Sequence, residues 1–140
     1  MSWNALFPAL RSMATADTGA GGLFETAGAN TITDFFDSLA TEDAAMPYAV
    51  VTTIDGVEDD TFANDITTHS VQVSIYTDRL ASGTDKGGDI QDRLFSVFHR
   101  GSPSVTGFTA TKSVVKAQRM LVEDVSYHHI TELDITLQKV

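Results

Sequence analysis

The feature that most constrains the fold is the alternation of apolar and polar residues between Thr67 and Asp78. A period of two is typical of a β-strand with one buried and one solvated face. Most residues of this segment are β-branched or aromatic, as strands favour. The apolar positions that share one face are Val71, Val73 and Ile75. The segment therefore predicts a half-buried strand against which the other elements pack.

Three more segments have strand character. Residues Met46–Thr53 form an apolar run entered through Pro47, and proline is tolerated at the first position of a strand. Two longer runs, from about Phe108 to Val122 and from about Tyr127 to Gln138, are separated by the polar pair Glu123–Asp124. In the last run apolar and polar residues alternate again, which predicts one buried and one wet face.

Two segments have the i, i+3, i+4, i+7 spacing of an amphipathic helix. The first is Trp3–Leu10, in which Pro8 predicts a kink because proline lacks an amide donor. The second is Ile32–Leu39, which follows Asn30 and Thr31. We interpret this second helix as a cover for the core. The alternative is an apolar patch that docks on a neighbouring subunit, formed by Phe35, Phe36 and Leu39.

A further helix is predicted from about Thr84 to Arg100. Gly101 at the position after the helix and Pro103 just beyond it are typical stop signals. Gly87 and Gly88 weaken the first turns, because glycine is a poor helix former. The start of this helix is therefore less well defined than its end.

In chain order these elements read α-(α)-β-β-α-β-β. We expect residues 1–140 to form a single α+β domain, with a mainly antiparallel sheet of about four strands and helices packed on one face. The N-terminus has no basic segment followed by an apolar one, and the longest apolar run, Ala44–Val51, is too short to span a membrane. The expectation is a soluble intracellular protein without a secretory signal.

The stretch from Asp55 to Asp65 is acidic and rich in turn-forming residues, which predicts a long, mobile hairpin loop. Its acids lack the spacing of an EF-hand calcium loop, which needs acids at alternate positions, a central glycine and a closing glutamate. The acidic residues singled out in this stretch are Asp55, Glu58, Asp59, Asp60 and Asp65.

The net charge of −10 is distributed unevenly. Up to Asp65 there are eleven acidic residues against Arg11 alone, whereas from Ile66 onward eight acidic residues balance eight basic ones. Binding to nucleic-acid phosphates needs clustered Lys and Arg, so this composition argues against it. We interpret the surplus as a solvated acidic surface, or as an acidic face beside DNA that has to slide past without sticking.

The residues show no catalytic or metal-binding pattern. Cysteine is absent, which removes thiolate metal sites and cysteine nucleophiles. His128 and His129 are adjacent in a predicted strand, so they point to opposite faces and cannot chelate one ion together; His69 is a candidate to meet one of them across strands. The glycine-rich segment Asp17–Gly22 is not followed by the Lys-Ser/Thr of a phosphate loop. We therefore expect no enzyme activity, cofactor or metal.

These segments together resemble the tail terminator proteins of long-tailed phages, also called tail-completion or tail-to-head joining proteins, and their relatives in gene-transfer agents. The resemblance covers most of the chain. It includes the helix Trp3–Leu10, the Gly-rich connection, a Pro-Tyr-x-Val-Val strand from Pro47, a His-x-Val-x-Val-x-Ile-Tyr strand from His69, a helix and two closing strands. The longer acidic and aromatic segment from Ala27 to Ala45 departs from the pattern of the family.

The resemblance implies a structural virion protein that forms a ring, commonly a hexamer. Such a ring caps the growing tail tube, stops its elongation and offers a surface for head attachment. The implied partners are further copies of the chain, the tail tube protein and head-tail connector or neck proteins, while DNA passes through the lumen without specific binding. The implied location is the head-proximal end of the tail in the virion, and the host cytoplasm during assembly.

Within such a ring, the acidic stretch Asp55–Asp65 is expected to line the lumen or to contact the tube. Phe35, Phe36 and Leu39 are the expected subunit contacts. Two alternatives stay open. One is a head-side neck or head-completion ring that binds the portal assembly. The other is a small-molecule enzyme or ligand-binding domain, which would need a concave pocket with perturbed titrating groups.

Overall fold

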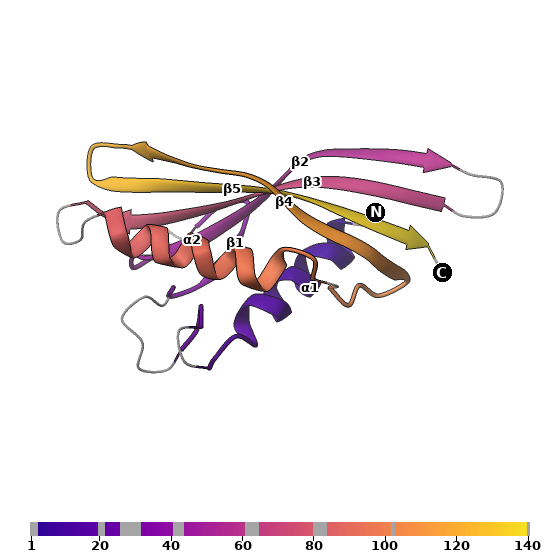
Figure 1. Cartoon of the computed structure of the whole chain (residues 1–140), viewed down its shortest axis with the longest axis horizontal. Coiled ribbons are helices and arrows are strands. Elements are labelled where there is room, and N and C mark those ends of the chain that lie inside the picture. The colour runs from indigo at the N-terminus through magenta and orange to yellow at the C-terminus, as the bar shows by residue number, and fades with distance from the viewer. Residues whose placement is uncertain are drawn as a thin grey trace.

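The computed structural model describes residues 3–19, 22–25, 32–40, 44–60, 65–79, 84–101 and 103–139. Within these ranges the chain forms two helices and five strands (Figure 1). In chain order they are α1 (Trp3–Thr15), β1 (Phe35–Asp37), β2 (Tyr48–Asp60), β3 (Asp65–Asp78), α2 (Thr84–Phe98), β4 (Phe108–Val122) and β5 (Ser126–Lys139). The expected α+β class is confirmed, with five strands where about four were expected.

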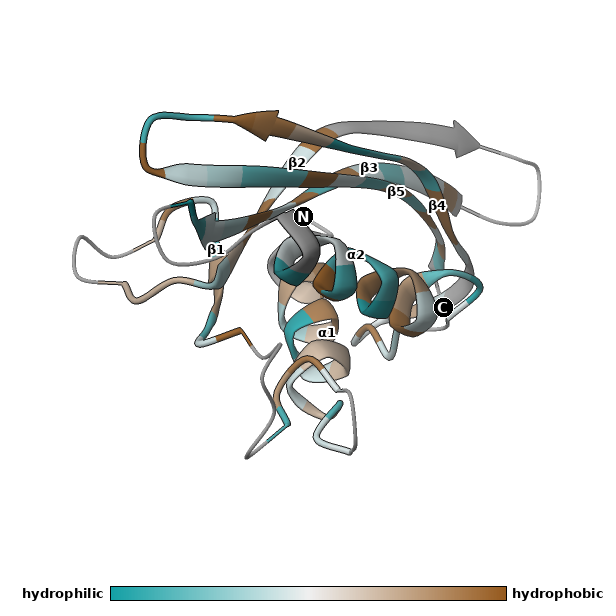
Figure 2. Cartoon of the chain, turned by 60° about the vertical axis from the view of Figure 1, so that its left-hand side comes forward, coloured by the Kyte–Doolittle hydropathy of each residue, from teal (hydrophilic) through white to brown (hydrophobic). Residues whose placement is uncertain are grey.

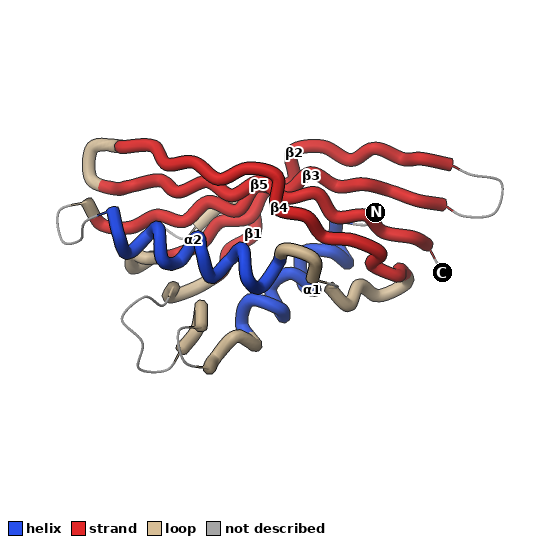
Figure 3. Tube along the Cα trace, in the orientation of Figure 1, coloured by secondary structure: helices blue, strands red, loops and turns tan. Residues whose placement is uncertain are grey.

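The strands form one sheet in the order β1-β2-β3-β5-β4. All neighbouring pairs are antiparallel except β1 and β2, which are parallel. Figure 3 shows both helices on the same side of this twisted sheet. We call that side the helix-covered face, marked on β3 by Val71, Val73 and Ile75. The opposite side is the outer face, marked on β3 by Gln72, Ser74 and Tyr76.

The core lies between the helix-covered face and α2. The buried stripe of α2 repeats every four residues and consists of Ile90, Leu94 and Phe98. Opposite it, β3 and β5 supply paired side chains, among them Val71 beside Leu133. Removing these stripes from water is the dominant favourable term in folding. Neither helix in the described residues has the length and apolar character needed to cross a membrane.

α1 is longer than the predicted helix, because it continues from Trp3 to Thr15 with Pro8 inside it. Its buried residues Leu6, Leu10 and Ala14 recur every four positions and face the core. The helix packs against α2 and β1. It therefore forms a second layer that closes the core under α2.

The helix predicted over Ile32–Leu39 is wrong. The chain there is extended, and Phe35–Asp37 pairs in parallel with Ala49–Val51 of β2. A helical stripe would bury Leu39 together with Ile32, but the Leu39 side chain is 82% exposed. Pairing with β2 supplies backbone hydrogen-bond partners from a neighbouring strand, and such tertiary context overrides local spacing.

The hairpin loop predicted over Asp55–Asp65 is also wrong. β2 continues to Asp60 and β3 begins at Asp65, so most of the stretch is a paired two-stranded ladder, and residues 61–64 lie outside the described residues. A register shift between Thr53 and Asp55 marks a β-bulge, which bends and twists a strand. Strand-favouring partners on β3 explain the pairing of this acidic segment, namely Ile66, Thr67 and Thr68.

The glycine-rich connection after α1 is held by one carboxylate. Asp17 accepts hydrogen bonds from the Leu23 amide (2.9 Å) and from Arg93 Nε on α2 (2.7 Å), and it forms an ion pair with the Arg93 guanidinium. The Arg93 hydrogen bond holds the pKa of Asp17 below its ordinary value. At Gly22 a Cβ would overlap the Asp17 carbonyl, so the glycine permits this turn.

The end of α2 is tied to the backbone of β4. Arg100, the residue before the expected stop signal Gly101, takes the left-handed conformation, with φ of 61°. Its amide donates to the Ser113 carbonyl (2.6 Å), and His99 Nδ1 accepts from the Val115 amide (3.1 Å). These two bonds fix the position of β4 relative to the helix.

Candidate assembly interface

The histidines do not form a metal centre. His128 and His129 point to opposite faces of β5, while His69 pairs with Ile135, six residues further along the strand than His129. Six residues of strand span about 20 Å, too far for a shared ion. Among the described residues no group of three or more His, Asp or Glu side chains is arranged to hold a metal.

His129 is a tightly packed core residue. Its side chain is 2% exposed, and both ring nitrogens are buried without a hydrogen-bond partner among the described residues. The ring lies against Gly87, where a Cβ would overlap Nε2. Burial lowers the pKa of His129, and the neighbouring His128 lowers it further. The imidazole is therefore held neutral, with no room for a ligand between it and α2.

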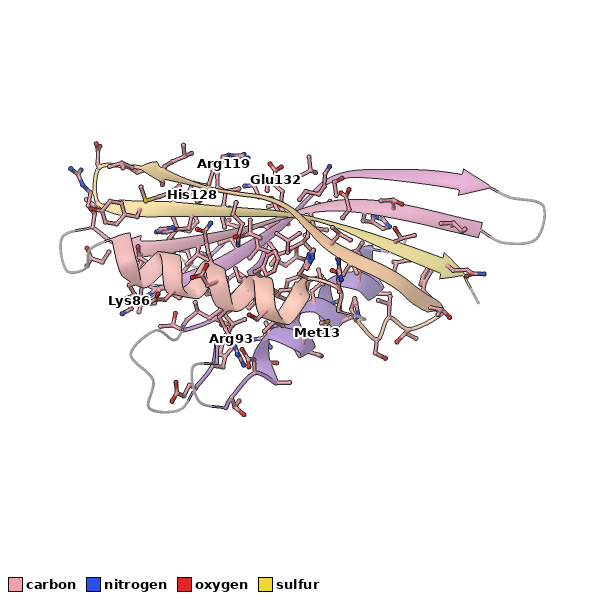
Figure 4. All side chains as sticks on the ribbon, in the orientation of Figure 1. Met13, Lys86, Arg93, Arg119, His128 and Glu132 are labelled. Carbon is pink, nitrogen blue, oxygen red and sulfur yellow. The ribbon has the colours of Figure 1, made fainter. Side chains whose placement is uncertain are left out.

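The outer face carries a row of rings across four strands. Phe36 meets Tyr48 edge-on with centroids 5.9 Å apart, Tyr48 lies 5.3 Å from Tyr76, and Tyr76 stacks on His128 at 4.4 Å. Figure 4 shows His128, with Arg119 beside it, on the side of the sheet away from the helices. Burial raises the pKa of Tyr76 and lowers that of His128. Both shifts favour the uncharged forms of Tyr76 and His128, the two stacked rings of the row.

Charged pairs follow the aromatic row on the same face. Arg119 of β4 contacts Glu132 of β5 at 3.0 Å, and Lys116 contacts Asp134 at 3.4 Å. Both basic side chains are about half exposed. Such exposed pairs contribute only about 0–1 kcal/mol each, so they do not commit the basic groups to one partner.

β4 is an edge strand with an apolar end. Met120, Leu121 and Val122 are 39%, 48% and 59% exposed, and Val125 in the following turn is 56% exposed. Figure 2 shows this end as a brown, hydrophobic arrowhead at the rim of the sheet. The sequence-based predictions did not include this patch. The available signal was three successive apolar residues before Glu123, which break the alternation of a half-buried strand.

β4 is also the basic edge of the sheet. It contains Lys112, Lys116 and Arg119 and no acidic residue. Arg100 and His99, in the turn after α2, occupy the Ser113 carbonyl and the Val115 amide, so this turn covers that part of the edge, and Gln91 of α2 donates to the Arg119 carbonyl (3.2 Å). The more accessible part of β4 is therefore Lys116–Val122.

The opposite edge consists of β1 and the distal half of β2. Among the described residues, β1 pairs with β2 only at Ala49–Val51, so the backbone of Thr52–Asp60 has β3 as its strand partner on one side alone. Ile54 on this half is 53% exposed. The predicted acidic residues are brought together on the hairpin, with Asp55, Glu58, Asp59 and Asp60 on β2 and Asp65 opening β3.

The three predicted interface residues have different environments. Phe35 is 1% exposed, and its ring lies between those of Phe7 and Phe98 at centroid distances of 6.2 and 6.4 Å. It is a core residue, which corrects its assignment to a surface patch. Phe36 lies on the outer face, and Leu39 projects from the edge beyond β1. Of the three, Phe36 and Leu39 remain available for contacts with another chain.

No protein-family model and no curated protein sequence matches this chain. Among solved structures, it is similar to a chain from the virion of a native gene transfer agent particle. The two chains superpose with a TM-score of 0.77 at 15% sequence identity, over 99% of this chain and 98% of the other. At this identity the similarity establishes a shared fold.

Proposed function

We propose that this protein is a structural component of a phage-like virion and forms the ring that terminates the tail tube. The observation that carries the proposal is the fold shared, over nearly the full length of both chains, with a chain of a gene transfer agent virion. Function does not follow from fold alone, so the surface properties of this chain have to agree with the role. Two of them do.

The first is the pair of dissimilar sheet edges. A ring is built from head-to-tail contacts, in which one surface of a subunit meets a different surface of the next. β4 and the β1–β2 edge are two such surfaces. Of the seven large hydrophobic residues that stand exposed in the described part of the chain, all but Phe95 lie on these edges or beside them. Three of them, Met120–Val122 on β4, are contiguous, and contiguous exposed apolar residues mark interaction sites.

The second is the acidic hairpin. The ends of β2 and β3 project beyond the helices (Figure 1) and carry Asp59, Asp60 and Asp65. We propose that this end of the hairpin lines the opening of the ring or contacts the tail tube. Carboxylates beside passing DNA repel its phosphates and prevent sticking. DNA then moves through the ring without specific binding.

In this role the protein is not an enzyme and uses neither cofactor nor metal. Its partners are further copies of itself in a hexamer, the number implied by the resemblance to tail terminators, together with the tail tube protein and the head-tail connector or neck proteins. Its place is the head-proximal end of the tail, reached by assembly in the host cytoplasm.

A second candidate is a head-side neck or head-completion ring, because the similar chain comes from a whole virion and a ring at either place uses the same kind of edges. Electron microscopy of particles assembled without this protein separates the two. A terminator leaves overlong or variable tail tubes and filled, tailless heads. A head-side ring leaves tails of normal length that fail to join leaky heads. Normal infectious particles would overturn both proposals.

A further inference from the structure

We infer that the protein binds a second copy of itself through opposite edges of its sheet, with Lys116–Val122 of β4 meeting β1 of the next copy. This inference names the subunit contact of the proposed ring. That such contacts close into a ring rests on the proposed function. The pairwise contact itself is a property of the isolated chain.

Charge complementarity is the first argument. Every charged residue of β4 is basic, and every charged residue of β1 and β2 is acidic. On the accessible part of β4 these are Lys116 and Arg119, and on β1 the residue is Asp37, whose side chain is exposed. Two copies therefore attract when unlike edges meet and repel when like edges meet. This favours head-to-tail over symmetric pairing.

Exposed apolar residues are the second argument. Leu39 and Ile54 stand exposed on the β1–β2 edge, while Met120, Leu121 and Val122 stand exposed on β4. Each edge thus has an apolar surface beside its charges. Burying both surfaces in one contact removes apolar area from water at two places at once.

Strand direction is the third argument. β1 and β2 are parallel to each other, and three antiparallel pairs lead from β2 to β4, so β4 runs opposite to β1. A contact that sets β4 of one copy alongside β1 of the next, with the strand directions of the two copies aligned, therefore pairs the two edges antiparallel. The junction then has the same sense as most pairs within the sheet.

The register of the sheet shows which residues meet. One row of Cα partners crosses all five strands, and its members are Phe36, Val50, Ser74, Ile130 and Arg119. The adjacent row ends at Asp37 on β1 and Gln118 on β4. When the rows of partners continue across the junction, the two ends of a row meet and Asp37 lies beside Gln118 of the neighbouring copy. Along β4, Lys116 and Arg119 stand two residues before and one residue after Gln118. Their pairs with Asp134 and Glu132 put them on the outer face, whereas Asp37 shares the helix-covered face with Val51 and Val73, so the charges attract across the thickness of the edge.

The contact depends mainly on side chains. β1 has only three residues, and the Phe35 amide is taken up by the Asp34 carboxylate at 2.7 Å. On β4, the turn after α2 occupies backbone groups of Ser113 and Val115, and Gln91 of α2 donates to the Arg119 carbonyl within the contact. A long backbone ladder between copies is therefore excluded, and charge reversal is the sharpest test.

The test uses two variants of the full chain. Lys116→Glu/Arg119→Glu makes both edges acidic, and Asp37→Lys makes the β1 edge basic. Self-association is measured by sedimentation velocity. Each variant alone is expected to raise the dissociation constant at least about tenfold, because like charges then face each other. An equimolar mixture is expected to restore wild-type association, because unlike edges alternate again.

Matched controls carry the same charge changes away from the junction. Lys86→Glu/Lys139→Glu controls for the first variant, and Asp92→Lys on α2 controls for the second. Circular dichroism shows whether the charge reversal disturbs folding. If it does, Lys116→Gln/Arg119→Gln replaces Lys116→Glu/Arg119→Glu. It is expected to weaken association less than the reversal.

Three results would overturn the inference: a wild-type chain that stays monomeric up to its solubility limit, a mixture that fails to restore association, or controls that weaken association equally. Failure of the proposed function is distinguishable. Suppose that the mixture restores association but particles lacking the protein have normal tails. The contact between copies would then stand, and the tail-terminator function would be rejected. If particles lacking the protein have overlong tails but the charge variants associate like the wild type, the terminator function would stand and the proposed contact would be rejected.

Discussion

The imidazole of His129 on β5 lies directly against the Cα of Gly87 in the first turn of α2, and a Cβ at residue 87 would overlap Nε2. This contact lets the start of α2 approach the sheet closely. It also explains why a helix tolerates glycine at a position where glycine costs stability. Gly88 beside it has open space around the position of a Cβ.

The two glycines therefore predict opposite effects of the same substitution. Gly87→Ala forces the buried His129 ring to move and is expected to destabilise the fold by about 1–3 kcal/mol, since overpacking outweighs the better helix propensity. Gly88→Ala is expected to stabilise it by about 0.5–1 kcal/mol. Urea denaturation of the two variants measures both. Equal effects of the same sign would show that the close contact is absent.

Acid is expected to destabilise the fold through its buried histidines. Burial puts the folded-state pKa of His69, His128 and His129 below the unfolded value of about 6.5. At a pH between the folded-state and unfolded-state pKa values, the unfolded chain binds more protons than the folded chain. The free energy of unfolding therefore keeps its full value above about pH 6.5 and decreases as the pH falls below about 6.5. Thermal unfolding across pH 5–8 tests this. His129→Leu is expected to flatten the dependence, and an unchanged slope would contradict the assignment.

The Asp17–Arg93 pair is expected to matter more than the Arg11–Asp34 pair. Asp17 is 11% exposed and also accepts the Leu23 amide, whereas both partners of the second pair are at least 40% exposed. Arg93→Met leaves the Asp17 carboxylate poorly solvated and is expected to cost about 1–3 kcal/mol. Arg11→Met, the matched control, is expected to cost about 0–1 kcal/mol. Chemical denaturation gives both values, and a larger loss at Arg11 would refute the ranking.

Phe35 and Leu39 are expected to separate folding from assembly. Phe35→Ala removes a ring from the core and is expected to cost about 3–5 kcal/mol of stability. Leu39→Ser changes an exposed side chain and is expected to stay within about 0.5 kcal/mol of wild type. Leu39→Ser should nevertheless weaken self-association in sedimentation velocity. A Leu39 variant that associates normally would remove this residue from the interface.

The acidic hairpin is expected to act in the particle and not in folding. Replacing Glu58, Asp59 and Asp60 with Ser keeps the strand pairing but removes three charges, and it is expected to slow DNA delivery or to impair attachment to the tube. Infectivity and electron microscopy of the particles measure these effects. The control replaces Asp89, Asp92 and Asp124 with Ser. Unchanged assembly and delivery with the hairpin variant would count against both roles.

Several elements were predictable because their signals are local. The alternation over Thr67–Asp78 and the apolar stripe of α2 lead directly to β3 and α2, since the period of burial along a chain reports the geometry of the element. The bounds of β4 match the prediction at both ends, and those of β5 match it within one residue. At α1, Pro8 did not stop the helix, which runs on to Thr15.

The errors occurred where distant residues decide. The spacing of Ile32–Leu39 favours a helix, but β1 forms because β2 offers a paired edge and because Phe7 and Phe98 enclose the ring of Phe35. The acidic segment after Asp55 favours a turn, but β3 holds it in a ladder. At Gly87 the helix was predicted correctly, whereas the reason for the glycine lay in His129 on another element.

By itself the sequence determined the α+β class, the elements β3, α2, β4 and β5, and the acidic bias of the N-terminal half. Only the tertiary structure decided which strands are edges. Strand order follows from pairing between segments far apart in the chain, and the order β1-β2-β3-β5-β4 puts the acidic and the basic strands on opposite rims. The candidate interface arises from that separation, and no local pattern reports the strand order, because it depends on pairs such as β3 with β5 that are far apart in the sequence.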